Sequence, residues 1–234
     1  MASKKGKVPS RTENKDVDAF LKKVAMAPLG SSSGRGRLIF ALDATASREP
    51  TWDRACQIQG QMFTETAALG GLEIQMAYYR GFGEFKTTSW IHKSAELVRL
   101  MTAVYCLGGH TQLAKILKHA LAETERKKVN ALVFIGDCVE EDVDHLCNLA
   151  GELGMRGVPA FVFQEGNEPR AARAFKQIAK LTNGAHCSFD SSSAKQLRDL
   201  LSAVAVYAAG GRKALENFSH TAGGEVRLLA NQVR

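Results

Sequence analysis

A short polar sequence follows the first strongly apolar run of the chain. The run covers Leu38 to Leu42, and after it come Asp43-Ala44-Thr45-Ala46-Ser47, in which a carboxylate and two hydroxyl groups alternate with alanines. Oxygen ligands of this kind, without histidine or cysteine among them, suit Mg²⁺ or Mn²⁺. The small alanines fit a tight turn around such an ion. The stretch therefore indicates one part of a divalent-cation site.

Two more oxygen-bearing residues occupy comparable places. Asp137 follows the apolar sequence ALVFIG, and Thr111 follows Gly108-Gly109-His110 at the start of a periodic apolar segment. Ligands of an open parallel sheet bind beyond the carboxyl ends of its strands. If the strands before Asp43 and Asp137 are neighbours, their carboxylates converge at that edge.

Two converging carboxylates need compensation. At a separation of ~4 Å and an effective dielectric of ~20, their repulsion costs ~4 kcal/mol, which a cation, a shared proton or a basic partner could offset. Arg48 follows the first motif, but no Lys or Arg lies close to Asp137 in the sequence. This distribution favours a bound cation.

Each of these residues also has a simpler interpretation. Asp43 and Asp137 fit turn or helix-cap positions, Thr111 fits the N-cap of a helix over 112–127, and Ser47 fits a loop end before Pro50. Independent caps have no reason to reproduce this spacing across three loops, so the joint pattern favours the metal site.

Alternating short and long apolar segments predict the elements that hold these residues. Strands are expected at 38–42, 72–79, 131–135, 159–163 and 185–189, and helices at 51–69, 94–105, 112–127, 141–153, 170–181 and 194–209. This alternation predicts an α/β fold with a Rossmann-like, mainly parallel sheet and helices on both faces. The sequence YYRGFGEFKTTSW leaves no room for a crossover helix, so a hairpin should add an antiparallel edge strand at about 84–89.

The whole pattern resembles the von Willebrand factor A (VWA) domain family with its metal-ion-dependent adhesion site. The resemblance covers about 38 to 210 and rests on Asp43-x-Thr45-x-Ser47, the Gly-Gly-x-Thr loop that ends at Thr111, and Asp137 after an apolar strand. It implies that Thr45, Ser47 and Thr111 are hydroxyl ligands, with Asp43 and Asp137 contributing directly or through water. A vacant position on the metal would then accept a carboxylate from a protein partner.

Two positions depart from the family's usual pattern. Serine is more common where this chain has Thr45, although the hydroxyl is retained. Asp137 is followed by Cys138-Val139-Glu140-Glu141-Asp142, an acidic sequence that would either strengthen cation attraction or begin a helix.

Charge divides the chain into three parts. Residues 1–36 form a basic N-terminal arm, residues 37–210 form the VWA-like domain, and residues 211–234 form a C-terminal tail that could dock on the domain or on a second copy of the chain. The net charge of the whole chain is +7. Residues 1–37 contain nine Lys/Arg and three Asp/Glu, whereas 38–210 contain 18 and 19. The basic charge thus belongs to the ends, and because it lacks interleaved aromatic residues, a nucleic-acid partner is not expected.

The cysteines and apolar runs indicate the compartment. Five scattered cysteines do not form a disulfide framework, no apolar run reaches the roughly 18 residues of a membrane span, and the basic start lacks an apolar signal region. A cytoplasmic location is expected. Cys138, His145 and Cys147 match no common zinc spacing.

Three functions remain open. The first is a metal-dependent protein-interaction module, for which similarity to intracellular bacterial adaptors suggests an AAA+ ATPase or a multiprotein assembly as partner. The second is a Rossmann-like phosphohydrolase or other metal-dependent enzyme that uses Asp43, although Thr45 stands where the Asp-x-Asp-x-Thr pattern needs a second carboxylate. The third is a scaffold whose metal is incidental and whose arm or tail holds the partners.

Overall fold

The computed structural model describes residues 36–49, 72–189, 194–221 and 224–233. The helix expected over 51–69 and the N-terminal arm up to residue 35 lie outside the described residues. The strands are β1 Gly36–Asp43, β2 Leu72–Arg80, β3 Glu84–Thr87, β4 Ala131–Gly136, β5 Ala160–Glu165 and β6 Ala185–Phe189. The helices are η1 Ala46–Arg48, α3 Ser94–Thr102, α4 Leu113–Arg126, α5 Val143–Met155, α6 Pro169–Leu181, α7 Ala194–Thr221 and α8 Gly224–Gln232.

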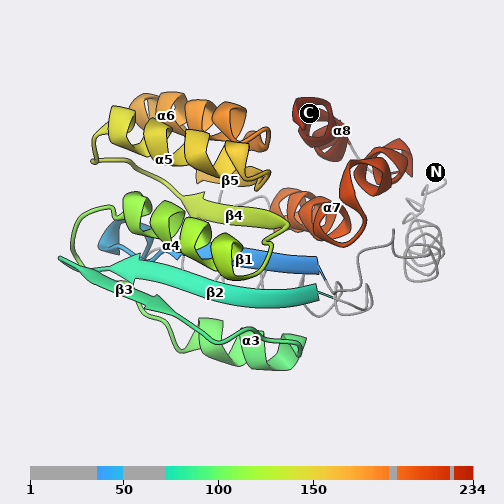
Figure 1. Ribbon diagram of the computed structural model, residues 1–234. Helices are drawn as coiled ribbons and strands as arrows, with labels where there is room; N and C mark the ends of the chain where they lie inside the picture. Colours follow the sequence, from blue (N-terminus) through green and yellow to red (C-terminus); the bar gives the residue numbers. More distant parts are fainter. Residues whose placement is uncertain (1–35, 50–71, 190–193, 222–223, 234) are drawn as a thin grey trace, which may run out of the picture.

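The described strands form one twisted sheet (Figure 1). Their order is β3-β2-β1-β4-β5-β6, and every neighbouring pair is parallel except β2 and β3. The predicted mainly parallel sheet and its antiparallel edge strand are therefore confirmed. From β1 the chain adds β2 and β3 on one side, and then β4, β5 and β6 on the other. The strand order therefore reverses between the parallel neighbours β1 and β4, which is where ligands bind in open α/β sheets.

Helices cover both faces of the sheet, as predicted. Alternate residues of β1 point to opposite faces, so Leu38, Phe40 and Leu42 pack in the core beneath α3, α7 and α8. Ile39 and Ala41 pack in the other core, beneath α4, α5 and α6. The apolar stripe that the sequence assigned to the helix after Thr111 is buried in this second core; it consists of Leu113, Ile116, Leu117, Ala120 and Leu121.

The described residues of the C-terminal tail dock on the domain. The helix expected over 194–209 is present, and the chain continues beyond a kink at Gly211, whose φ of 71° suits glycine. The side chain of Gln232 accepts a hydrogen bond from the main-chain nitrogen of His186 in β6 at 2.9 Å. Apolar residues of the tail complete the core on this face: Leu215, Phe218, Val226, Leu229 and Val233. The division of the chain at residue 210 stays a prediction.

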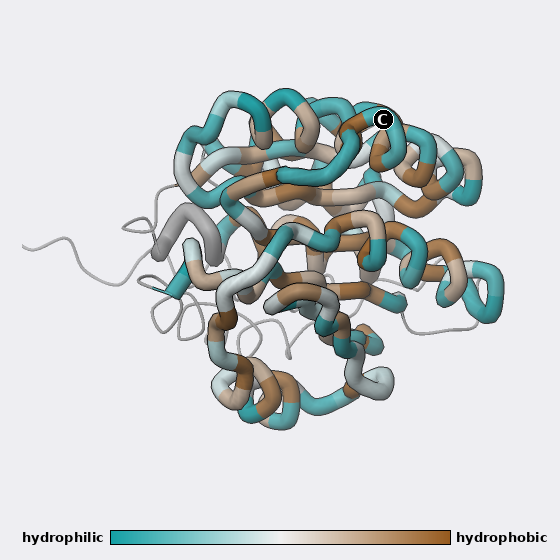
Figure 2. The backbone as a smooth tube through the Cα atoms, turned by 90° about the vertical axis from the view of Figure 1, so that its left-hand side faces the viewer, coloured by the Kyte–Doolittle hydropathy of each residue, from teal (hydrophilic) through white to brown (hydrophobic). Residues whose placement is uncertain are grey.

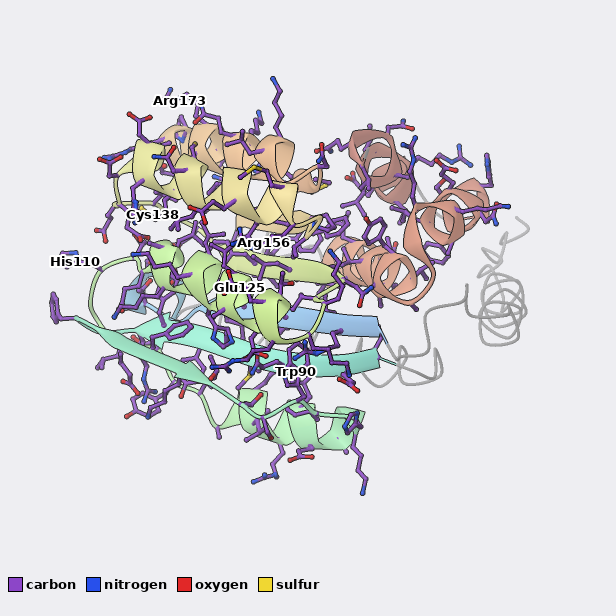
Figure 3. All side chains as sticks on the ribbon, in the orientation of Figure 1. Trp90, His110, Glu125, Cys138, Arg156 and Arg173 are labelled. Atoms are coloured by element: carbon purple, nitrogen blue, oxygen red, sulfur yellow. The ribbon has the colours of Figure 1, made fainter. Side chains whose placement is uncertain are left out.

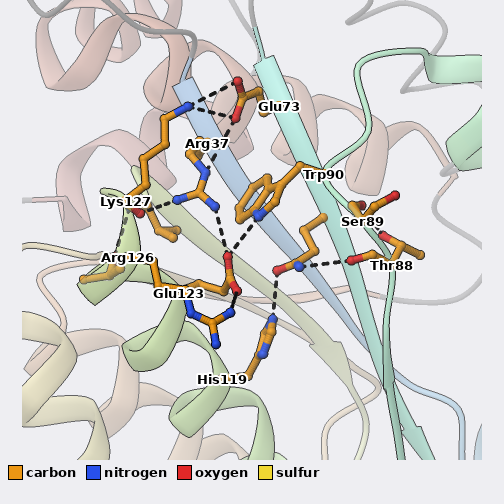
Figure 4. A network of polar contacts seen from close by, with 12 residues as sticks. Arg37, Glu73, Thr88, Ser89, Trp90, His119, Glu123, Arg126 and Lys127 are labelled. Atoms are coloured by element: carbon orange, nitrogen blue, oxygen red, sulfur yellow. Dashed lines mark hydrogen bonds and ion pairs between the residues drawn. The ribbon is translucent and has the colours of Figure 1, made fainter.

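A buried polar network lies around the start of β1 (Figure 4). The guanidinium of Arg37 contacts the carboxylate of Glu123 at 3.0 Å and lies 3.7 Å from the centre of the Trp90 ring. Trp90 donates to the same carboxylate at 2.9 Å, and Arg126 pairs with it from the surface. Burial acts to raise the pKa of Glu123, but the hydrogen bonds from Trp90 and Arg37 outweigh it and lower the pKa.

The docked tail can be tested with two adjacent leucines. Leu229→Ala removes a fully buried side chain and should destabilise the protein by about 2–4 kcal/mol in urea unfolding. Leu228 is 58% exposed, so Leu228→Ala should change the free energy of unfolding by about 0.5 kcal/mol at most. Equal effects of the two changes would contradict docking of the tail.

The buried ion pair between Arg37 and Glu123 should contribute more to the free energy of unfolding than the surface ion pair between Arg126 and Glu123. Arg37→Met leaves the buried Glu123 carboxylate without one donor and should cost about 3 kcal/mol, whereas Arg126→Met, at a 76% exposed side chain, should cost about 0.5 kcal/mol or less. Folding lowers the pKa of Glu123 below its ordinary value of 4.5. The ionised carboxylate therefore stabilises the fold above pH 4.5, and this stabilisation is lost as the pH falls through the pKa that Glu123 has in the folded protein. The cost of Arg37→Met should accordingly shrink at acid pH in urea titrations.

Candidate metal centre

The carboxylate of Asp43 is buried at the end of β1 and is held by three donors. Its Oδ1 accepts hydrogen bonds from the main-chain nitrogen of Thr45 at 2.8 Å and from the Thr45 hydroxyl at 2.7 Å. Its Oδ2 accepts a hydrogen bond from the Tyr79 hydroxyl at 2.9 Å. Burial raises the pKa of Asp43, although these hydrogen bonds and the charge of Arg48 oppose the rise. Burial and the charge of Asp43 also raise the pKa of Tyr79, which keeps its proton as donor.

The turn after Asp43 brings two hydroxyl groups together. Thr45 Oγ1 lies 3.2 Å from Ser47 Oγ. Thr45 is buried and Ser47 is exposed, so this pair of oxygens extends from the interior to the surface. Ala44 fits beneath the turn, fully buried, and its main-chain nitrogen donates to the carbonyl of Tyr79 at 3.0 Å. The sequence prediction placed these residue types in a tight turn, and they form one.

Arg48 anchors this turn to the strands behind it. Its guanidinium is buried and donates to the main-chain carbonyls of Asp43 at 3.0 Å and Ile135 at 3.4 Å. Its Nε and Nη2 lie 3.0 and 2.9 Å from a carboxylate oxygen of Glu165, at the end of β5. The positive charge of Arg48 is thus paired with Glu165 and contacts the main chain of Asp43.

A second loop, residues 103–112, lies directly against the first turn. The main-chain nitrogen of Leu107 donates to the carbonyl of Ala44 at 3.0 Å, and Leu107 forms a parallel bridge with Thr45. A side-chain carbon on Gly109 would lie only 2.0 Å from the carbonyl oxygen of Gly81, so glycine is required at this close approach. The loop carries Thr111 to the same end of the sheet.

A third loop brings in Asp137 beside β1. Asp137 follows Gly136 at the end of β4, and a side-chain carbon on Gly136 would lie 3.3 Å from Cβ of Asp43. The Oδ1 atom of Asp137 is buried and has no hydrogen-bond partner among the described residues. A buried carboxylate oxygen without a partner is unusual, because desolvation of a charged acceptor is costly. Such an atom fits the donor set of a bound cation.

Thr111 and Glu140 lock the second and third loops together. The main-chain nitrogen of Thr111 donates to Glu140 Oε2 at 3.0 Å, and the main-chain nitrogen of Glu140 donates to Thr111 Oγ1 at 2.9 Å. His110 Nδ1 lies 3.3 Å from the same Glu140 oxygen. This reciprocal pair fixes the Thr111 hydroxyl relative to the loop that carries Asp137.

The acidic sequence after Asp137 caps two helices. Glu141 accepts hydrogen bonds from the main-chain nitrogens of Leu113 and Ala114, at 2.6 and 2.8 Å, and so caps α4 from a different loop. Asp142 is the N-cap of α5. The N-cap of α4 is Gln112, without a side-chain cap bond, so the simpler interpretation of Thr111 as that cap is wrong.

The five predicted ligands therefore lie on three adjoining loops at the carboxyl edge of the parallel strands; they are Asp43, Thr45, Ser47, Thr111 and Asp137. Figure 2 looks at the molecule from this edge. The described residues include no group of three or more His, Cys, Asp or Glu side chains placed to hold a metal, so Cys138, His145 and Cys147 form no such centre. The candidate centre consists instead of two carboxylates and three hydroxyls.

Sequence reasoning missed Tyr79 and Glu165 as parts of this arrangement. Tyr79 appeared only as a strand residue, and Glu165 lay beyond the strand expected at 159–163. Both acquire their roles from strand register, since Tyr79 lies opposite Asp43 and β5 lies beside β4. Knowledge of the strand order would have been the only signal.

Comparison with known proteins identifies the fold. No protein-family model matches this sequence, and comparison with curated proteins gives no match. Solved structures do match. A von Willebrand factor type A protein from Catenulispora acidiphila has a TM-score of 0.56 and 14% identity, with coverage of 73% of this chain and 43% of that one. The SpRpn10 VWA domain has a TM-score of 0.55 and 12% identity, with coverage of 70% of this chain and 95% of that one.

A third match is the human COPII-coat protein Sec24c, with a TM-score of 0.55, 11% identity, and coverage of 72% of this chain and 32% of that one. This chain thus spans less than half the length of the C. acidiphila and Sec24c structures. The matches confirm the VWA-like α/β fold. No helix among the described residues is long and apolar enough to cross a bilayer.

Replacing Asp43 should reveal the cost of its buried charge. Folding raises the pKa of Asp43 above its ordinary value of 3.8. The protonated side chain therefore stabilises the fold below pH 3.8, and this stabilisation is lost as the pH rises through the pKa that Asp43 has in the folded protein. In EDTA at neutral pH, Asp43→Asn should therefore unfold at a higher urea concentration than the wild type, and the difference should narrow at acid pH.

Asp142→Asn is the matched control, because it removes an exposed charge and keeps a good N-cap residue. It should leave the urea midpoint nearly unchanged. A lower midpoint for Asp43→Asn at neutral pH would contradict the destabilising role of the Asp43 charge.

Proposed function

We propose that this protein is a metal-dependent protein-interaction module, in which a divalent cation at the carboxyl edge of the sheet coordinates a carboxylate of a partner protein. The observation that carries the proposal is the buried, unpartnered Oδ1 of Asp137, which follows β4, while the hydroxyl pair of Thr45 and Ser47 follows the neighbouring strand β1. An oxygen-only donor set suits Mg²⁺ or Mn²⁺ and does not suit zinc.

The ligands would divide into two groups. Thr45, Ser47, Thr111 and the free oxygen of Asp137 would hold the cation. Both oxygens of Asp43 already accept hydrogen bonds, so Asp43 would contribute mainly its negative charge, directly or through water. The cation would supply positive charge for a partner carboxylate next to a loop that carries Glu140, Glu141 and Asp142.

The fold supports a partner within a larger assembly. Sec24c, one of the similar structures, is described as a COPII-coat protein, and a coat is an assembly of proteins. By the resemblance to intracellular bacterial adaptors, the partner would be an AAA+ ATPase or a multiprotein assembly in the cytoplasm. A nucleic-acid partner has no support in the charge of residues 38–210.

An enzymatic role for Asp43 has less support. A nucleophilic carboxylate needs an oxygen that faces the substrate. Asp43 has no exposed surface, and three donors already hold its oxygens. These contacts favour a charged support for a cation over attack on phosphate.

Metal binding should raise the melting temperature of the wild-type protein. A cation that binds only the native state stabilises it by about 2.7 kcal/mol at a hundredfold excess over its dissociation constant. Thr111→Val removes one proposed ligand and should abolish most of this increase, measured by thermal melts in EDTA and in Mg²⁺ or Mn²⁺. Thr102→Val, at the exposed end of α3, should keep it.

The metal-dependent difference is the readout, because Thr111→Val also loses the acceptor for the Glu140 main chain and lowers stability in both conditions. Identical wild-type melting curves with and without metal would contradict the site. Turnover of a generic phosphate ester by the wild type, lost in Asp43→Asn, would instead support the enzyme.

A further inference from the structure

Three large apolar side chains are exposed beside the candidate metal centre. Phe82 is 82% exposed at the tip of the β2–β3 hairpin, and Tyr105 and Leu107, on the loop before Thr111, are 61% and 44% exposed. We call these three residues the apolar rim. Exposed apolar residues that gather in one place, in contrast to scattered single ones, indicate an interaction surface.

The rim is held in place from below. The guanidinium of Arg80 lies 4.0 Å from the centre of the Tyr105 ring and donates to the Tyr105 carbonyl at 3.1 Å. Glu84 fixes Arg80 through two hydrogen bonds of 2.8 and 2.9 Å. The main-chain nitrogen of Gly81 donates to the Leu107 carbonyl at 3.3 Å. The hairpin tip and the loop therefore form one preorganised surface.

The rim is continuous with the three loops of the candidate centre. Leu107 pairs through its backbone with Thr45. The Phe82 ring packs edge-on against His110, with ring centres 5.2 Å apart, and His110 immediately precedes Thr111. Figure 3 shows His110 and Cys138 at the same end of the molecule, away from Trp90. A segment that reaches a cation between Thr45 and Thr111 would lie beside the rim.

A positive charge also stands at the hairpin tip. The ammonium of Lys115 donates to the Gly83 carbonyl at 2.8 Å and to the Gln112 amide at 2.7 Å. Both acceptors are neutral, and Lys115 forms no ion pair with another described residue. Its charge therefore favours an acidic segment on this side of the centre.

We propose that the partner segment that supplies the metal-bound carboxylate also carries a large apolar side chain, preferably aromatic, that packs on Phe82, Tyr105 and Leu107. Because Leu107 of the rim pairs directly with Thr45, the apolar residue of an extended partner segment lies only a few residues from the carboxylate. The inference rests on the proposed function, since it gives the partner segment a second point of contact next to the cation.

Short peptides test the inference on the full-length protein. The probe is a blocked peptide that contains Phe-Gly-Asp, and its two companions contain Ala-Gly-Asp and Phe-Gly-Asn. In the presence of Mg²⁺, titrations followed by amide chemical shifts should show Phe-Gly-Asp binding about tenfold tighter than Ala-Gly-Asp, as expected for a partly buried aromatic side chain. Phe-Gly-Asn should lose binding, and EDTA should abolish the binding of Phe-Gly-Asp.

Two exposed residues provide matched variants. Phe82→Ser should remove most of the advantage of Phe-Gly-Asp over Ala-Gly-Asp, measured as the ratio of the two dissociation constants for the same variant. Met155→Ser is the control, because Met155 is 81% exposed at the end of α5, at the opposite edge of the sheet from the three loops. It should bind all three peptides as the wild type does.

The outcomes separate the two proposals. Equal, Mg²⁺-dependent binding of Phe-Gly-Asp and Ala-Gly-Asp would overturn the apolar contact and leave the metal-dependent function standing. Binding of Phe-Gly-Asp that is unchanged by EDTA would overturn both.

A further outcome concerns the chain itself, which carries an acidic and an aromatic residue two positions apart, Asp18 and Phe20. If Phe20→Ser in the full-length protein tightens the binding of Phe-Gly-Asp severalfold, the rim is occupied by the chain's own N-terminal segment. That result would overturn the assignment to a separate partner.

Discussion

The buried charge of Asp43 is the constraint on which the carboxyl edge of the sheet depends. An ionised carboxylate without solvent contact carries a desolvation cost of several kcal/mol, which only hydrogen bonds and opposite charge can offset. Thr45 and Tyr79 supply the hydrogen bonds, and Arg48 supplies charge from the main-chain side. Arg48 is itself buried, and Glu165 in turn pairs with it. One carboxylate thus ties together residues from β1, β2 and β5.

A second set of hydrogen bonds joins the loops at the same end of the sheet. Glu140 exchanges hydrogen bonds with Thr111, and Glu141 caps α4, so the loop after β4 completes the start of a helix that precedes β4 in the chain. Leu107 is paired with the turn after β1. Hydrogen bonds therefore hold the three loops to one another, and the positions of the proposed ligands depend on these contacts. Preorganisation of this kind lowers the cost of binding an ion or a partner.

Much of the fold follows from local pattern. The apolar runs before Asp43 and Asp137 predicted β1 and β4, the stripe from Leu113 to Leu121 predicted α4, and the glycines after Tyr79 predicted the hairpin. These features depend on residues close together in sequence, where periodicity and turn chemistry decide the structure. The proposed ligands were found in the same way, because each directly follows or opens such an element.

The supporting contacts required long-range information. Tyr79 meets Asp43 only because β2 and β1 pair in one register, and Glu141 caps α4 only because the β4 loop passes its N-terminus. The sequence of the tail did not predict that it packs on the domain, because glycines interrupt its apolar pattern. Val226 and Leu229 are nevertheless buried in the core. Tertiary contact, and not local propensity, determines each of these three cases.

The contacts of Arg48 and Glu141 also bear on the order in which the chain is made. During synthesis the turn that contains Thr45 emerges early, but Glu141 and Glu165, which hold α4 and Arg48, emerge about a hundred residues later. Until then Asp43 and its neighbours remain in water, where the ionised carboxylate of Asp43 carries no desolvation cost. The candidate metal centre is consequently completed late in folding, and a ribosome-bound chain that stops before Glu165 contains the proposed ligands without the ion pair that holds Arg48.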